Sequence, residues 1–111
     1  MPLANPILPE RDLLTLTAEL VDIPSVSHDE TAITDRIEQE LRSFAHLEVT
    51  RIGNNLVART QLGRHYRVVL GGHTDTVPVN DNASARVEGD TLWGLGSADM
   101  KGGLAVMLEL A

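Results

Sequence analysis

The sequence contains no cysteine among its 111 residues. Disulfide bonds and thiolate metal sites are therefore excluded, and any metal site must use histidine, aspartate or glutamate. Basic residues are also few, with nine lysines and arginines against 16 aspartates and glutamates, for a formal net charge of -7. Proteins that bind nucleic acids neutralise phosphates with clustered basic residues, so a nucleic-acid partner is not expected.

Long apolar runs are absent as well. No run approaches the roughly 20 residues that a membrane span needs. The first residues lack the basic segment and apolar core of a signal peptide. We therefore expect a cytoplasmic protein with no membrane partner. Hydrophobic residues still make up 42% of the chain, enough for one small domain with a single core.

The hydrophobic pattern predicts two helices in the first half of the chain. After an irregular lead-in over residues 1–9, apolar residues at helical spacing predict a helix from Glu10 that Pro24 ends. A second helix is predicted over residues 29–44. Ser27 and Glu30 match a capping box, in which the serine hydroxyl would cap the glutamate amide.

The second half of the pattern predicts strands and a last helix. Alternating polarity predicts two hairpins, which comprise residues 46–52 with 56–59 and residues 85–88 with 91–93. Residues 66–70 are apolar on both faces after Arg67, which is typical of a central strand covered by helices. Residues 100–111 are apolar nearly all round and predict a buried helix. This order of elements indicates an α/β fold. The chain stops inside this last apolar run without a C-cap signal, so we expect it to be a fragment.

Two glycine-rich segments carry candidate metal ligands. The segment GGHTDTVP at residues 71–78 follows the predicted central strand and contains His73 and Asp75. The segment GLGSADMKGG at residues 94–103 contains Asp99 at a loop-to-helix junction. Ligands of open α/β sheets gather at the carboxyl ends of strands. His73 and Asp99 could therefore bind zinc, cobalt or manganese, while Asp75 could orient His73.

The same residues can also be interpreted without a metal. A His-x-Asp pair alone is weak evidence, and Asp99 could simply cap the last helix. His28 lies beside a predicted cap and is expected to be an exposed polar residue rather than a ligand or base. Residues 94–103 match neither of two common nucleotide-binding motifs. The segment lacks the Gly-Lys-Ser/Thr ending of a P-loop, and Asp99 replaces the third glycine of a dinucleotide fingerprint.

Together and in this order, the two glycine-rich motifs resemble the N-terminal signatures of the M20 metallopeptidase and deacylase family. The similarity includes IPSVS at residues 23–27 and NLVART at residues 55–60. Within the family, the chain is most similar to the actinobacterial succinyl-diaminopimelate desuccinylases. The resemblance implies that residues 1–111 are the N-terminal part of a zinc-peptidase-like α/β catalytic domain, with a mixed sheet and flanking helices.

The resemblance also implies site roles and a reaction. His73 would bind one zinc ion, Asp99 would bridge two, and Asp75 would be a catalytic residue that orients His73. Cobalt or manganese could replace zinc. The metal pair would polarise an amide carbonyl and activate water. The implied reaction converts N-succinyl-LL-2,6-diaminopimelate to succinate and LL-2,6-diaminopimelate, in lysine and diaminopimelate biosynthesis. Another M20 deacylase or carboxypeptidase, such as an acetylornithine deacetylase, is the alternative.

Several family features have no counterpart in these 111 residues. Relatives carry a general-base glutamate beside a glutamate ligand beyond Asp99, then further ligands, and an inserted lid domain through which they form homodimers. Glu109 is the only acidic residue after Asp99 and does not belong to a Glu-Glu pair. We therefore expect the 111 residues alone to be inactive, either as part of an enzyme or as a non-catalytic remnant.

Overall fold

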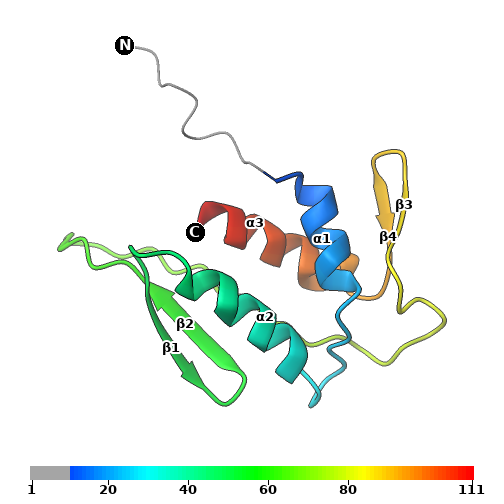
Figure 1. The fold of residues 1–111 in the computed structure, drawn as a ribbon, viewed down its shortest axis with the longest axis horizontal. Coiled ribbons are helices and arrows are strands. Elements are labelled where there is room, and N and C mark those ends of the chain that lie inside the picture. The colour runs from blue at the N-terminus through cyan, green and yellow to red at the C-terminus, as the bar shows by residue number, and fades with distance from the viewer. Residues whose placement is uncertain (1–10) are drawn as a thin grey trace, which may run out of the picture.

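A computed structural model describes residues 11–111. The expected lead-in over residues 1–9 and the expected helix start at Glu10 lie outside these residues. The described chain contains helices and small antiparallel sheets (Figure 1), so the predicted α/β class is confirmed. In chain order the elements are α1 (Leu13–Val21), α2 (Thr31–Arg42), β1 (Glu48–Ile52), β2 (Asn55–Arg59), β3 (Arg86–Glu88), β4 (Thr91–Trp93), the wide turn η1 (Ser97–Lys101) and α3 (Gly102–Leu110).

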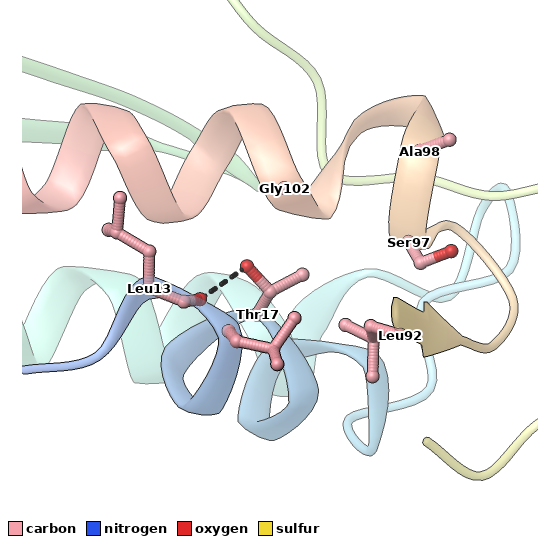
Figure 2. Close-up of a pocket in the computed structure, with 7 residues that line it drawn as sticks. Leu13, Thr17, Leu92, Ser97, Ala98 and Gly102 are labelled. Atoms are coloured by element: carbon pink, nitrogen blue, oxygen red, sulfur yellow. Dashed lines mark hydrogen bonds between the residues drawn. The ribbon is translucent and has the colours of Figure 1, made fainter. Parts of the chain in front are cut away.

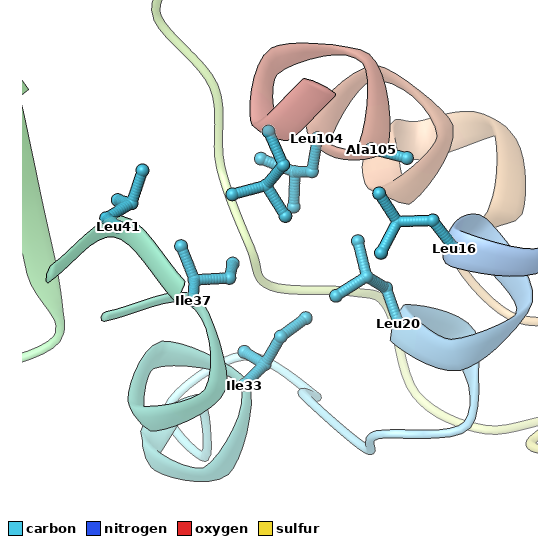
Figure 3. Packing of buried hydrophobic residues seen from close by; sticks show 8 residues of the cluster. Leu16, Leu20, Ile33, Ile37, Leu41, Leu104 and Ala105 are labelled. Carbon is cyan, nitrogen blue, oxygen red and sulfur yellow. The ribbon is translucent and has the colours of Figure 1, made fainter. Parts of the chain in front are cut away.

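The core lies where the three helices meet (Figure 3). Each helix contributes apolar residues spaced three or four apart, which places them on one face. The buried members are Leu16 and Leu20 of α1, Ile33, Ile37 and Leu41 of α2, and Leu104, Ala105 and Leu108 of α3. The two N-terminal helices thus form where the sequence predicts them, although each is shorter than expected.

The last helix is less buried than its sequence suggests. Leu104, Ala105 and Leu108 face α1 and α2, but Val106 is 43% exposed and Leu110 is 71% exposed. The expectation of burial on nearly all sides is therefore wrong for the face of α3 that carries Val106 and Leu110. Within residues 11–111, α1 and α2 cover only one side of α3.

The predicted central strand at residues 66–70 does not form. Tyr66, Val68, Val69 and Leu70 are between 55% and 87% exposed, and the segment has no ladder partner. A strand needs a neighbour to pair with its backbone groups. No such neighbour lies beside this segment in the part of the chain that the structure describes. The strands instead form two separate antiparallel hairpins rather than one mixed sheet.

Both predicted hairpins are confirmed. β1 pairs antiparallel with β2, from Glu48 opposite Arg59 to Ile52 opposite Asn55. This hairpin lies against α2, whereas the β3–β4 hairpin projects on the other side of the helices (Figure 1).

None of the helices in the described chain is long and apolar enough to cross a membrane.

Candidate metal centre

The structure brings His73 and Asp99 together from 26 residues apart. The Nε2 atom of His73 lies 2.8 Å from Oδ1 of Asp99. Both side chains are open to solvent, with the histidine 47% and the aspartate 84% exposed. Because one end of the imidazole ring and a carboxylate face each other at the surface, a cation could replace the proton between them.

Asp75 lies at the other end of the same imidazole ring. The Nδ1 atom of His73 is 3.1 Å from Oδ1 of Asp75 and 3.2 Å from its carbonyl oxygen. When Nδ1 carries the proton and donates a hydrogen bond to Asp75, the Nε2 lone pair is free to bind a cation. The three sequence-predicted site residues are therefore adjacent in space.

A short segment after α1 positions residues 71–78, the first site loop, which carries His73 and Asp75. Val26 and Thr76 form an isolated parallel bridge, in which the Ser27 amide donates to the Thr76 carbonyl at 3.0 Å and the Thr76 amide donates to the Ser25 carbonyl at 2.9 Å. The buried Ser25 hydroxyl donates to the Thr74 carbonyl at 2.6 Å. The backbone on both sides of Asp75 is thereby tied to residues 25–27.

The same segment anchors residues 94–103, the second site loop, which carries Asp99, through a buried lysine. The side chain of Lys101 is almost fully buried, and its Nζ atom donates to the Ile23 carbonyl at 2.7 Å. Burial lowers the pKa of this amine, and the carboxylate of Asp22 partly offsets that effect. The sequence analysis assigned no role to Lys101, because lysine side chains are rarely buried.

A glycine allows the two site loops to approach closely. Gly96 has a positive φ of 79°, and a Cβ atom there would lie 2.7 Å from Cγ2 of Thr76. Asp99 then lies in a kinked part of η1, where its backbone dihedrals are not helical. The last helix begins after Lys101, without a side-chain cap. The alternative in which Asp99 caps the last helix is therefore wrong.

The predicted capping box is also wrong. The Ser27 hydroxyl does not cap α2 but donates to Oδ2 of Asp75 at 2.5 Å. Glu30 instead accepts from the amide of His28, and no side chain caps the first turn of α2. Ser27 is a site residue that sequence reasoning assigned to a helix end, because a serine three residues before a glutamate fits a cap equally well. His28 is exposed, as predicted.

Contacts within the site shift the pKa values of His73 and Asp75 in opposite directions. Burial lowers the pKa of His73, but the bonds to the Asp99 carboxylate and the Asp75 carbonyl outweigh this and raise the pKa above its usual value. The Ser27 hydroxyl is the main cause that lowers the pKa of Asp75, and His73 adds to this effect. Asp75 is therefore a carboxylate at neutral pH.

The donor set fits a divalent cation in part. A histidine nitrogen and a carboxylate oxygen are both common zinc ligands, and donors on one tetrahedral zinc lie about 3.4 Å apart. The 2.8 Å contact between His73 and Asp99 would need to open by roughly 0.6 Å to admit the ion. Residues 11–111 hold no cluster of three or more histidine, aspartate or glutamate side chains arranged for a metal. The two donors thus form half of a closed coordination shell.

Two pockets lie near these loops. One, of about 220 Å³, is lined by residues 76–77 and 94–99 and so includes Asp99. The other, of about 320 Å³, lies between α1 and η1 (Figure 2). Its lining is mostly apolar, and its Thr17 hydroxyl already donates to the Leu13 carbonyl at 2.7 Å. No charged side chain lines the second pocket, so the candidate chemistry lies beside the smaller one.

Known proteins are similar to this chain. Residues 69–111, which include all three candidate site residues, match the model of the peptidase family M20/M25/M40. A Mycobacterium tuberculosis protein provisionally named succinyl-diaminopimelate desuccinylase is 52% identical over 101 residues, covering 90% of this chain and 28% of the relative. The succinyl-diaminopimelate desuccinylase of Corynebacterium glutamicum is 50% identical over 100 residues, covering 88% of this chain and 27% of the relative.

One more distant relative is named for a different activity. A Pyrococcus abyssi protein provisionally named as a hydrolase of LysW-lysine and LysW-ornithine is 33% identical over 102 residues, covering 91% of this chain and 29% of the relative. The chain thus spans less than a third of the length of the curated relatives described above. Residues 69–111 thus match the peptidase family M20/M25/M40, and nearly the whole chain is similar to part of two relatives about half identical to it.

Proposed function

We propose that residues 1–111 form the N-terminal part of the catalytic domain of a metal-dependent amidohydrolase. In this proposal His73 and Asp99 are ligands of zinc, or of cobalt or manganese, and Asp75 is the catalytic residue that orients His73. The observation that carries the proposal is the 2.8 Å contact between His73 Nε2 and Asp99 Oδ1, with Asp75 at the opposite ring nitrogen.

Each of these side chains has a separate task. Asp75 holds the proton of His73 at Nδ1, so that Nε2 presents its lone pair to the cation. The Asp99 carboxylate supplies negative charge that a divalent cation neutralises. Bound divalent cations supply Lewis acidity toward an amide carbonyl oxygen and an attacking water molecule. The remaining ligands and the general base are proposed to come from residues beyond Asp99 in the whole protein. That part is also proposed to contain a lid domain through which the protein forms a homodimer.

The proposed substrate is N-succinyl-LL-2,6-diaminopimelate, which would give succinate and LL-2,6-diaminopimelate. The activity for which relatives about half identical to this chain are named supports this choice. A second candidate is another deacylase of the same class, such as an acetylornithine deacetylase. The name of the Pyrococcus relative supports only that similar chains can act on a different substrate. Both candidates share the metal chemistry and differ in the acyl group.

The reading frame provides the first test of the domain proposal. If the gene continues past codon 111, we expect it to encode a Glu-Glu pair and a late histidine that complete the site. A stop codon at that point would instead support a non-catalytic remnant.

The second test measures hydrolysis by the full-length zinc-loaded protein. We expect release of succinate from N-succinyl-LL-2,6-diaminopimelate at a higher kcat/KM than release of acetate from N-acetylornithine. His73→Ala should abolish most of the activity and lower the zinc content, whereas His65→Ala, at an exposed histidine outside the site, should change neither. Equal activity of His73→Ala and wild type would contradict the proposal. The 111-residue chain alone should hydrolyse neither substrate.

A further inference from the structure

Ser27 makes a contact that the fold itself does not need. Its hydroxyl lies 2.5 Å from Oδ2 of Asp75 and 3.3 Å from the carbonyl oxygen of Thr76. A serine hydroxyl has one proton, and the shorter contact identifies Asp75 as its main acceptor. The residue itself is exposed, so its side chain does not fill the core.

The contact holds the Asp75 carboxylate at two points. Oδ2 accepts from Ser27, while Oδ1 lies 3.1 Å from Nδ1 of His73. A carboxylate held by only one oxygen can turn about its terminal bond, because that torsion is broad. With both oxygens engaged, the carboxylate plane is fixed and Oδ1 stays beside the imidazole ring.

Other groups already supply the structural link between the two segments. The bridge between Val26 and Thr76 uses only main-chain atoms, and the Ser25 hydroxyl, which is buried, binds the Thr74 carbonyl. Neither interaction uses the hydroxyl of Ser27. The contribution of that hydroxyl is therefore directed at the side chain of Asp75.

We propose that Ser27 is a positioning residue, which holds Asp75 at Nδ1 of His73 and so favours the tautomer that presents Nε2 to the metal. The metal part of this inference rests on the proposed function, in which Nε2 of His73 is a ligand. The tautomer part does not. Ser27 acts through Asp75 and His73 and touches neither metal nor substrate.

The test compares three variants of the 111-residue chain by nitrogen NMR of the histidine rings, followed by titration with Zn²⁺. Ser27→Ala removes the hydroxyl, Ser27→Thr keeps it, and Ser43→Ala is the matched control. The Ser43 hydroxyl binds the Glu40 carbonyl at the end of α2, away from the site. Circular dichroism of each variant reports whether the fold is kept.

In metal-free wild type, Asp75 favours the neutral-form proton of His73 on Nδ1 and Asp99 favours it on Nε2, so we expect both forms to be populated. Ser27→Ala should shift part of the population to the Nε2-protonated form and weaken zinc binding about tenfold, the low end for groups behind a ligand. Ser27→Thr should restore both values, and Ser43→Ala should change neither.

Two results would overturn the inference. One is a Ser27→Ala variant with unchanged tautomer populations and zinc affinity, and the other is loss of the fold in that variant, which would assign Ser27 a structural role. If Zn²⁺ leaves the Nε2 signal of wild type unmoved, the metal proposal fails. The tautomer comparison would then still decide whether Ser27 positions His73 through Asp75.

Discussion

His73 is placed between two carboxylates that act on different ring nitrogens. Asp75 lies at Nδ1 and Asp99 at Nε2, so the ring has a defined orientation before any cation binds. The sequence predicted this trio through the resemblance of its two glycine-rich motifs to a known family, since a His-x-Asp pair alone is weak evidence. It did not predict the role of Ser27, since a pattern common to helix caps cannot reveal that the hydroxyl points to a loop 48 residues away.

The role of Asp75 can be separated from that of a ligand. In the full-length protein, Asp75→Ala should lower kcat/KM by about 10–100-fold, the range typical of groups that orient a metal ligand, with a smaller loss of bound zinc than His73→Ala. Kinetics and metal analysis of the same preparations measure both effects. Asp90→Ala removes an exposed carboxylate from a hairpin turn and serves as the control. An Asp75→Ala enzyme with unchanged turnover would refute the orienting role.

At the scale of elements, the predictions of the helices and hairpins were right, and the prediction of a central strand at residues 66–70 was wrong. Helix and hairpin patterns are local, because their partners lie within a few residues or on one apolar face. The run at residues 66–70 depends on strands to pair with, and none lies beside it among residues 11–111. Apolar character on both faces indicates that a segment is suited to burial in a sheet, but it does not show that partner strands lie beside it.

The close approach of the two site loops depends on Gly96. Gly96→Ala should destabilise the fold by more than the roughly 1–2 kcal/mol that a left-handed alanine costs, because its Cβ atom would also clash with Thr76. Gly89→Ala is the matched control, since Gly89 has a φ of 62° and open space around it. Urea unfolding midpoints of the two variants measure the difference. Equal losses would show that the loops are not in contact at Gly96.

The contact between α1 and the other helices supplies much of the core. Leu20 is fully buried, so Leu20→Ala should cost about 2–5 kcal/mol of unfolding free energy. Leu13 lies on the same helix but is 37% exposed, and Leu13→Ala should cost clearly less. Denaturant unfolding followed by circular dichroism tests this. Similar losses for both variants would contradict the observed orientation of α1.

At the scale of the whole molecule, one ion-pair network connects the three helices. Arg11 at the start of α1 binds Glu40 of α2 and Glu109 of α3, each at 2.7 Å, and Arg36 bridges Glu40 to Glu19 of α1. Glu40 is nearly buried at its centre. Charged side chains at the ends and faces of α1, α2 and α3 therefore link the three helices.

This network makes stability depend on pH in a defined direction. The hydrogen bond from Arg11 is the main cause that lowers the pKa of Glu40 in the folded chain. An unfolded glutamate has a pKa near 4.3, so the unfolded state binds its proton first. The stability that Glu40 contributes should be complete above about pH 5 and should fall as pH drops through the lowered folded value.

Glu40→Gln tests this linkage. The variant should lose about 1–3 kcal/mol at pH 7, and its stability should fall less steeply than that of wild type between about pH 5 and pH 3. Glu88→Gln, which removes the same charge from an exposed hairpin, should follow the wild-type curve. Parallel curves for Glu40→Gln and wild type would refute the role of Glu40.

The central claim is that His73 and Asp99 share one cation, and nitrogen NMR of the histidine rings during a Zn²⁺ titration tests it most directly. We expect that the Nε2 signal of His73 moves with zinc while its Nδ1 keeps the proton, that the rings of His28 and His65 do not respond at the same concentrations, and that Asp99→Asn weakens the response. A shift at Nδ1 instead, or a response that Asp99→Asn leaves intact, would contradict the claim.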